Sequence, residues 1–384
     1  MTVYFRPCGD LALAPLPRSR ADELFLERLS AATGVKIETS DEVDYEDWME
    51  PASMLDAALR AGVEIAVLPR ERLPDAIAAP EVLIPGAPCP DMLIGRQIST
   101  DPAFFSQARL SWPPRCNDLA NRYTMLEAFR NNAGRELRVA MMPGDPNFAG
   151  KPRPVFGKEP GDLSLGEALL AFAGRDCLVK QVYPAKILPL LTITPEADMD
   201  EKAAEQLFID EVGFHFMRFE GDRDALLVQE IVTMTHETRF FVVNGEVVTG
   251  AACIEADTPR QHPEVATVLA DRFEILRNSG TIVTSPEAAE KLLGFARKVA
   301  AEIAAETPDI PHFVLDACLG KDGEPLVIEM NPIAESGLYG IDAGRLFTAI
   351  LEAARREPAR KPAAVPVDTA AEDEETLDLA SFDI

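Results

Sequence analysis

The first 114 residues alternate short apolar runs with longer stretches of helical periodicity. The apolar runs Val3–Phe5 and Glu64–Leu68 predict two buried strands. Ala21–Ala32 and Pro51–Ala61 have the spacing of amphipathic helices, and the second is expected to end at Gly62. Strands that alternate with helices predict a small α/β domain with a partly parallel sheet over residues 1–114.

From about residue 115 to residue 357 the pattern changes to longer helices and strand hairpins, after a proline-containing linker at Ser111–Arg115. The expected helices are Asp118–Arg130, 199–212, Pro286–Glu306 and Ala343–Ala354. The expected strands are Leu137–Met142, Cys177–Val182, Lys186–Thr194, Leu226–Val232, Arg239–Val243, Glu246–Ile254, Phe313–Leu319 and Pro325–Met330. Asn244-Gly245 and Asp322-Gly323 each separate two of these strands, and both dipeptides are typical of hairpin turns.

The last 27 residues, 358–384, are rich in Ala, Pro and acidic residues. Residues 368–384 contain seven Asp or Glu and no Lys or Arg. Such a segment buries too little apolar surface to offset the entropy lost on ordering, so we expect a disordered acidic tail. The alternative is that its few apolar residues dock on another surface.

Length and charge narrow the class of protein. A chain of 384 residues with 47% apolar residues predicts two or three domains with real cores. The formal net charge of −27 argues against nucleic acid as a partner, because an acidic surface repels phosphate backbones. The N-terminal residues lack a signal-peptide pattern, and no apolar stretch reaches transmembrane length. We therefore expect a cytoplasmic protein with no membrane partner.

The cysteines and histidines are scattered along the chain. None of the six cysteines forms a CxxC pair, and the four histidines are not close to them in sequence. This distribution argues against a zinc site, an iron–sulfur cluster and a disulfide framework, and it favours reduced thiols.

The most informative segment is the predicted hairpin from Val314 to Asn331. Side chains alternate along a strand, so Glu329 and Asn331 are expected on one face. A turn at Asp322-Gly323 can bring Asp316 beside them. Two carboxylates and a carboxamide oxygen suit Mg²⁺ or Mn²⁺, and MgATP is the natural ligand of such a site. The alternative is an acidic hairpin edge that faces solvent.

The sequence VLDACLGKDGEPLVIEMNP, followed by SGLYGID, resembles the C-terminal core of ATP-grasp enzymes. The resemblance implies that Asp316, Glu329 and Asn331 hold one or two magnesium ions between the ATP phosphates. It also implies the α/β (α+β) architecture of that family. Two α+β subdomains would enclose ATP over residues 115–357, after a smaller α/β domain at 1–114.

Upstream segments fit the same family. Lys180, in Leu178-Val179-Lys180, resembles the strand lysine that contacts nucleotide phosphates, and Lys186 lies six residues on and could also reach a phosphate. An exposed strand end is the alternative for Lys180. Residues 227–232 resemble the hinge strand, which places the hinge near 229–236. Backbone groups of four hinge residues would read adenine there: Gln229, Glu230, Ile231 and Val232. A plain buried strand is the alternative.

The stretch Glu237–Gly245 resembles a family segment in which an arginine points at the transferred phosphate. The resemblance makes Arg239 the main catalytic candidate, together with Lys180, and assigns Glu237 to the nucleotide site. The alternative for Arg239 is a salt bridge to Glu237 or to another acid.

Four further residues complete the candidate set. Arg122 stands where family members have a basic residue that contacts ATP, and Ser336 and Tyr339 would face the acceptor. Arg6 would hold a substrate carboxylate, with a surface position as the alternative. Residues 181–186 contain no glycine whereas 143–161 contain four, so the loop that covers the phosphates stays open.

The resemblance implies an ATP-dependent carboxylate–amine ligase that uses Mg²⁺ and an acyl-phosphate intermediate. Its partners would be carboxylate and amine substrates, either small molecules or peptides, and a homodimer is the expected assembly. Two alternatives remain at this point. One is a kinase or phosphotransferase on the same scaffold, and the other is a non-catalytic nucleotide-binding sensor.

Overall fold

The structure is a computed structural model, and its described residues form thirteen segments. They are 2–6, 12–17, 20–67, 82–85, 123–141, 163–181, 190–213, 225–253, 273–276, 281–308, 312–331, 333 and 336–356. Several predictions lie outside them: the linker at 111–115, the loop at 143–161, the tail, Arg122 and Lys186. Arg6 is described as part of a strand, but its side chain is not.

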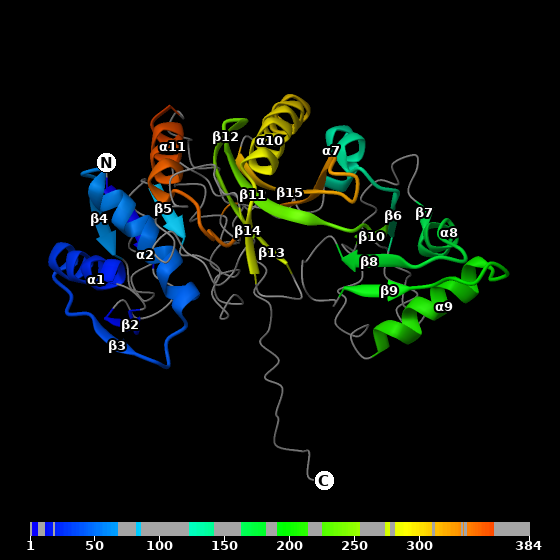
Figure 1. The fold of residues 1–384 in the computed structure, drawn as a ribbon, viewed down its shortest axis with the longest axis horizontal. Coiled ribbons are helices and arrows are strands. Elements are labelled where there is room, and N and C mark those ends of the chain that lie inside the picture. Colours follow the sequence, from blue (N-terminus) through cyan, green and yellow to red (C-terminus); the bar gives the residue numbers. More distant parts are fainter. Residues whose placement is uncertain are drawn as a thin grey trace, which may run out of the picture.

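Two antiparallel-rich sheets occupy the middle and one end of the molecule (Figure 1). The five-stranded sheet has the order β7 (Leu163–Ser164), β6 (Leu137–Met141), β10 (Ala225–Glu230), β8 (Cys177–Gln181), β9 (Leu191–Ile193). Helices α8 (Leu165–Leu170) and α9 (Glu201–Val212) share a buried apolar cluster with it. The four-stranded sheet has the order β12 (Glu246–Ala252), β11 (Thr235–Val243), β15 (His312–Leu319), β16 (Pro325–Asn331). A separate hairpin pairs β13 (Phe273–Leu276) with β14 (Thr281–Thr284).

The four-stranded sheet has helices on both faces because apolar residues alternate along its strands. Phe240 and Phe313 belong to the cluster that contains α10 (Pro286–Glu306). Phe241 and Val314 belong to the cluster that contains α11 (Ala343–Arg356). Both expected hairpins form, and the first turns through Asn244 and Gly245 with φ of 54° and 77°, as a tight hairpin turn requires.

The N-terminal part contains the parallel sheet that the sequence predicts. Strand β1 (Thr2–Arg6) lies between β4 (Glu64–Val67) and β5 (Val82–Pro85), and both pairings are parallel. A shorter parallel pair joins β2 (Leu13–Pro15) to β3 (Glu38–Ser40). Two helices, α1 (Arg20–Thr33) and α2 (Tyr45–Arg60), complete this part.

The start of α2 differs from the prediction. Pro51 was expected near the first turn, where a proline costs nothing, but the helix begins six residues earlier at Tyr45. The added turns bury Tyr45, Trp48 and Met49. This burial outweighs the backbone hydrogen bond that a proline removes inside a helix.

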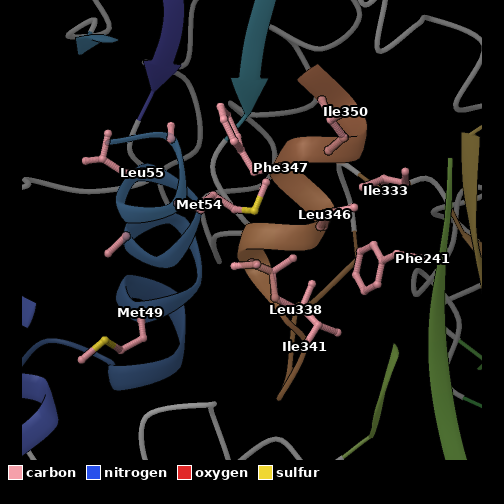
Figure 2. Packing of buried hydrophobic residues seen from close by; sticks show 14 of the residues in the cluster. Met49, Met54, Leu55, Phe241, Ile333, Leu338, Ile341, Leu346, Phe347 and Ile350 are labelled. Atoms are coloured by element: carbon pink, nitrogen blue, oxygen red, sulfur yellow. The ribbon is translucent and has the colours of Figure 1, made fainter. Parts of the chain in front are cut away.

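Helix α2 packs against α11, so the N-terminal part and the four-stranded sheet share one core (Figure 2). Met54 and Leu55 of α2 face Leu346 and Phe347 of α11 in this core, and all four are buried. The division at residue 114 remains a prediction, and these two helices pack across it.

The predicted helix at 118–130 is interrupted in its described part. Residues 123–125 form a 3₁₀ turn, Leu126 is extended, and α7 runs over Glu127–Asn132. Leu126 has no side chain that could cap the new helix. The carboxylate of Glu306, at the end of α10, instead accepts hydrogen bonds from the N–H groups of Glu127 and Ala128 at 2.8 and 3.1 Å.

Within the described part of the chain, no helix combines the length and the apolarity that crossing a bilayer requires.

Candidate active site

Asp316 and Glu329 lie directly opposite each other on β15 and β16. The hairpin turn alone does not produce this pairing. Hydrogen bonds between Gly320 and Glu324 close a three-residue loop, and Leu319 then pairs with Pro325. In that register Asp316 would face residue 328, and Glu329 would lie on the opposite face of the sheet.

A β-bulge corrects the register. The ladder shifts between Asp316 and Ala317, so that Ile328 has no counterpart on β15. Val327 therefore stays in the core, while Glu329 lies on the same face as Asp316. The same face carries Asn331, whose amide nitrogen donates to Glu329 at 3.0 Å and to Asp316 at 3.2 Å.

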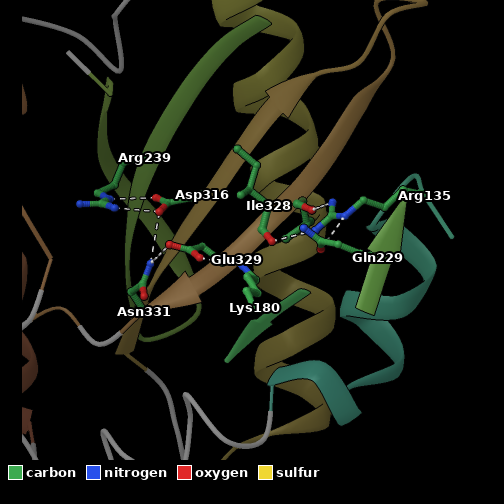
Figure 3. A network of polar contacts seen from close by, with 9 residues as sticks. Arg135, Lys180, Gln229, Arg239, Asp316, Ile328, Glu329 and Asn331 are labelled. Carbon is green, nitrogen blue, oxygen red and sulfur yellow. Dashed lines mark hydrogen bonds and ion pairs between the residues drawn. The ribbon is translucent and has the colours of Figure 1, made fainter. Parts of the chain in front are cut away.

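Arg239 and Asp316 form a buried bidentate ion pair (Figure 3). Their Nε–Oδ1 and Nη2–Oδ2 distances are 2.9 and 2.8 Å, and the side chains are 12% and 2% exposed. Burial raises the pKa of Asp316 above its usual value, against the attraction of the guanidinium. Arg239 also donates to the Gly337 carbonyl at 3.2 Å and lies 4.8 Å from the centre of the Tyr339 ring.

The second ion pair joins the two sheets. Lys180 on β8 donates to Glu329 on β16 over 2.8 Å, and the lysine side chain is only 11% exposed. The charge of Lys180 lowers the pKa of Glu329 to about 2. Burial alone would lower the pKa of Lys180, but the Glu329 carboxylate outweighs this effect and raises it. The alternative that Lys180 is an exposed strand end is therefore wrong.

The donor set fits a hard divalent cation. Among the described residues no group of three or more His, Cys, Asp or Glu could hold a metal ion, so a site here needs Asn331 as its third ligand. Its amide nitrogen now faces both carboxylates, and a half-turn of the amide would present its oxygen instead. The chemistry thus fits Mg²⁺ once Arg239 and Lys180 have other anions to contact.

Residues 176–351 match the model of an ATP-grasp domain family, the third family of its clade. This part of the chain is an ATP-grasp domain. The matched segment contains β8, β10, the four-stranded sheet and every residue of the two ion pairs. The expected mixed α and β architecture is confirmed.

Solved structures with similar folds include three ligases. D-cycloserine synthetase DcsG is 17% identical, with 79% of this chain and 93% of that chain covered and a TM-score of 0.46. D-alanine–D-alanine ligase from Bacillus anthracis in complex with ATP is 11% identical, with 93% and 97% covered and a TM-score of 0.42. The ATP-grasp ligase PsnB with precursor peptide PsnA2 and AMPPNP is 13% identical, with 92% and 97% covered and a TM-score of 0.41. No curated protein matches the sequence.

The predicted hinge of the ATP-grasp domain begins at the end of β10. Gln229 and Glu230 still belong to the sheet, where Gln229 pairs with both neighbouring strands. Ile231 and Val232 follow the strand end, and Ile231 is 48% exposed. Backbone groups that could read adenine are therefore expected at these last two residues.

The remaining candidates of the ATP-grasp domain lie near the ion pairs to different degrees. Tyr339 covers Arg239, and Ser336 is buried in the same loop. Glu237 lies on β11, where its carbonyl accepts from the N–H of Cys253 at 3.0 Å. Burial raises the pKa of the Cys253 thiol, and the Glu237 carboxylate adds to this effect.

Three residues at the site escaped the sequence analysis. Tyr123 is buried against Lys180, and burial raises its pKa. Glu50 on α2 accepts hydrogen bonds from the N–H groups of Leu338 and Tyr339 in the loop that follows β16. Arg135 contacts the bulge of β16. All three lie far from the metal hairpin in sequence, and none stands in a recognisable motif.

Proposed function

We propose that the chain is an ATP-dependent carboxylate–amine ligase that uses Mg²⁺. The observation that carries this proposal is the Lys180–Glu329 pair, which brings a phosphate-binding type of side chain to a carboxylate of the hairpin. The two residues are 149 positions apart, and they come from different sheets of one ATP-grasp domain.

Charge balance supports a ligand that carries both signs. Arg239 and Lys180 neutralise Asp316 and Glu329 one for one. A nucleotide with its metal ion offers phosphate oxygens to the two cations and a cation to the two carboxylates. The exchange leaves no buried charge without a partner, whereas binding of either ligand alone would.

In the proposed reaction the substrate carboxylate takes the terminal phosphoryl group of ATP, which gives an acyl phosphate and ADP. The amine then attacks the acyl carbon, and an amide forms as phosphate leaves. Arg239 and Lys180 would donate hydrogen bonds to phosphate oxygens and offset the charge that builds there. Asp316, Glu329 and Asn331 would hold Mg²⁺, which supplies positive charge beside the same oxygens when bound.

The test is ADP release with Mg²⁺ over a panel of amino acids and peptides. We compare the wild type with Glu329→Gln and with Glu324→Gln as a matched control. Glu324 lies on the same hairpin, but it is exposed and pairs with Lys291 on the surface. We expect Glu329→Gln to lower turnover by about 10²-fold or more, because it removes transition-state charge stabilisation. The control should stay within about twofold, as surface changes do.

The products separate the alternatives. An amide together with ADP and phosphate supports the ligase, whereas a stable phosphorylated product would indicate a phosphotransferase. ATP binding without turnover across the whole panel would indicate a nucleotide sensor. Unchanged turnover in Glu329→Gln, with its fold intact by circular dichroism, would refute the metal assignment.

A further inference from the structure

Arg135 lies between α7 and β6 and connects three segments of the chain. Its Nη2 donates to the carbonyl of Ile328 at 2.9 Å, and its Nη1 donates to the carbonyl of Val327 at 2.5 Å. Its Nε donates to the side-chain oxygen of Gln229 at 3.1 Å, and Nη1 also reaches the carbonyl of Ala133 at 3.0 Å. One guanidinium thus bonds to the bulge of β16 and to the end of β10 (Figure 3).

The contact with Ile328 has a specific physical meaning. A bulge residue has no partner residue across the ladder, so its buried backbone groups must find hydrogen bonds elsewhere. Arg135 provides one for the Ile328 carbonyl. The planar fork of arginine spans this carbonyl and the preceding one together, which the single ammonium of a lysine does not do in the same way.

The bulge in turn determines where Glu329 points. Without the extra residue the register of Leu319 and Pro325 would continue, and Glu329 would turn toward the core side of the sheet. Stabilising the bulge therefore stabilises the position of Glu329 beside Asp316 and Lys180, although Arg135 forms hydrogen bonds with none of these three side chains in the described structure.

The loop that carries Arg135 is itself fitted to β16. Gly134 has a φ of 64°, and a Cβ atom at this position would lie 2.7 Å from the Cβ of Leu326. On the other side, the N–H of Glu136 donates to the carboxylate of Glu230 at 3.1 Å. The backbone around Arg135 is therefore held against both the metal hairpin and the hinge strand.

We propose that Arg135 is a positioning residue, which holds the β-bulge at Ile328 and thereby keeps Glu329 on the metal-binding face. The consequence for Mg²⁺ rests on the proposed function, whereas the consequence for the bulge does not. The two parts are therefore tested by separate measurements.

The bulge is tested by hydrogen exchange on the whole protein without nucleotide. The variants are Arg135→Met and Arg135→Lys, with Arg130→Met as the matched control. Arg130 belongs to the same segment, and its side chain donates to the Thr124 carbonyl at 3.0 Å and to the Met125 sulfur at 3.5 Å. We expect both Arg135 variants to speed exchange in residues 326–331 by about tenfold or more, with smaller changes in β11 and β12. The control should not. Exchange that is unchanged at 326–331, or raised evenly across the sheet, would overturn the proposal.

The consequence for the metal is tested by ATP binding at increasing Mg²⁺ concentration. We expect Arg135→Met to raise the Mg²⁺ concentration for half-maximal binding by about tenfold or more, as loss of an outer contact does at metal sites. ATP affinity in EDTA should change by less than about threefold, because the phosphate-binding cations stay in place.

A double-mutant cycle identifies the residue through which Arg135 acts. On the Glu329→Gln background, Arg135→Met should cause no further change in the Mg²⁺ dependence. A full additional effect there would overturn the route through Glu329. If the wild type shows no Mg²⁺-dependent binding, the proposed function fails, and hydrogen exchange still decides the role of Arg135 at the bulge.

Discussion

At the residue scale, the site is a row of alternating charges. Arg239, Asp316, Asn331, Glu329 and Lys180 contact one another in that order (Figure 3). Each buried charge has a partner of the opposite sign, which is the condition for keeping charges away from water. The candidate acids were visible in the sequence, but the pairing of Arg239 with Asp316 combines two roles that the sequence kept apart.

The first prediction concerns the pH dependence of stability. The pKa of Glu329 is lowered from 4.5 to about 2, so its charge stabilises the folded state above pH 4.5. This contribution is lost as the pH falls toward 2, because the carboxylate then takes up a proton in the folded state as well. The difference in unfolding free energy between the wild type and Glu329→Gln should therefore shrink from pH 4.5 to pH 2.

Urea unfolding at a series of pH values measures this difference. Glu324→Gln provides the correction for the change in net charge, since Glu324 lies on the same hairpin but 77% exposed. A difference that stays constant, or that grows as the pH falls, would contradict the Lys180–Glu329 pair.

At the scale of elements, short segments owe their geometry to neighbours that are distant in sequence. Helix α7 begins where Glu306 of α10 caps it, and not where its own sequence would start it. Strand β16 places Glu329 through a bulge. The loop before β6 approaches β16 closely at Gly134, where no side chain fits.

The second prediction compares two glycines with left-handed backbones. Gly134 and Gly174 have φ of 64° and 76°, but only Gly134 has neighbours within 4 Å of the added Cβ. Gly174→Ala should cost about 1–2 kcal/mol of unfolding free energy, from backbone strain alone. Gly134→Ala should cost about 1–3 kcal/mol more, because the new methyl group overlaps Leu326. Equal losses in urea unfolding would contradict the close approach of this loop to β16.

At the scale of the whole molecule, three apolar clusters stabilise the fold. One lies in the five-stranded sheet, one lies between the four-stranded sheet and α10, and one joins that sheet to α11 and the N-terminal helices. The third cluster is continuous across the expected domain boundary. The face of the sheet that carries it also carries Asp316 and Glu329, so the N-terminal helices pack beside the site.

The third prediction follows from this shared cluster. Phe347 of α11 is 1% exposed and faces α2 (Figure 2). Phe347→Ala should cost about 3–5 kcal/mol, as large-to-small changes in a core do. We expect calorimetry to show that the N-terminal part and the four-stranded sheet unfold in one transition, which the substitution moves as a whole. Thr348→Ala, on the exposed side of the same helix, is the control. Two separate transitions, with only one of them moved, would contradict the shared core.

Features that depend on neighbouring residues were determined by the sequence itself. Helix α10 has the predicted bounds because Ser285 caps it and Pro286 starts it. The Asn244-Gly245 turn forms as expected, since both residues accept a positive φ. The capping box of Ser164 and Glu167 was an equally local signal for α8, but it went unused.

Only the tertiary structure decided which distant groups meet. The partner of Glu329 is Lys180 from another sheet, and the bulge that places Glu329 carries a hydrogen bond from Arg135. Such contacts leave no periodicity or spacing in the sequence, because they join segments whose separation along the chain is arbitrary. Local patterns therefore predicted the donors of the site, whereas packing between sheets and helices determined their partners, their burial and their pKa values.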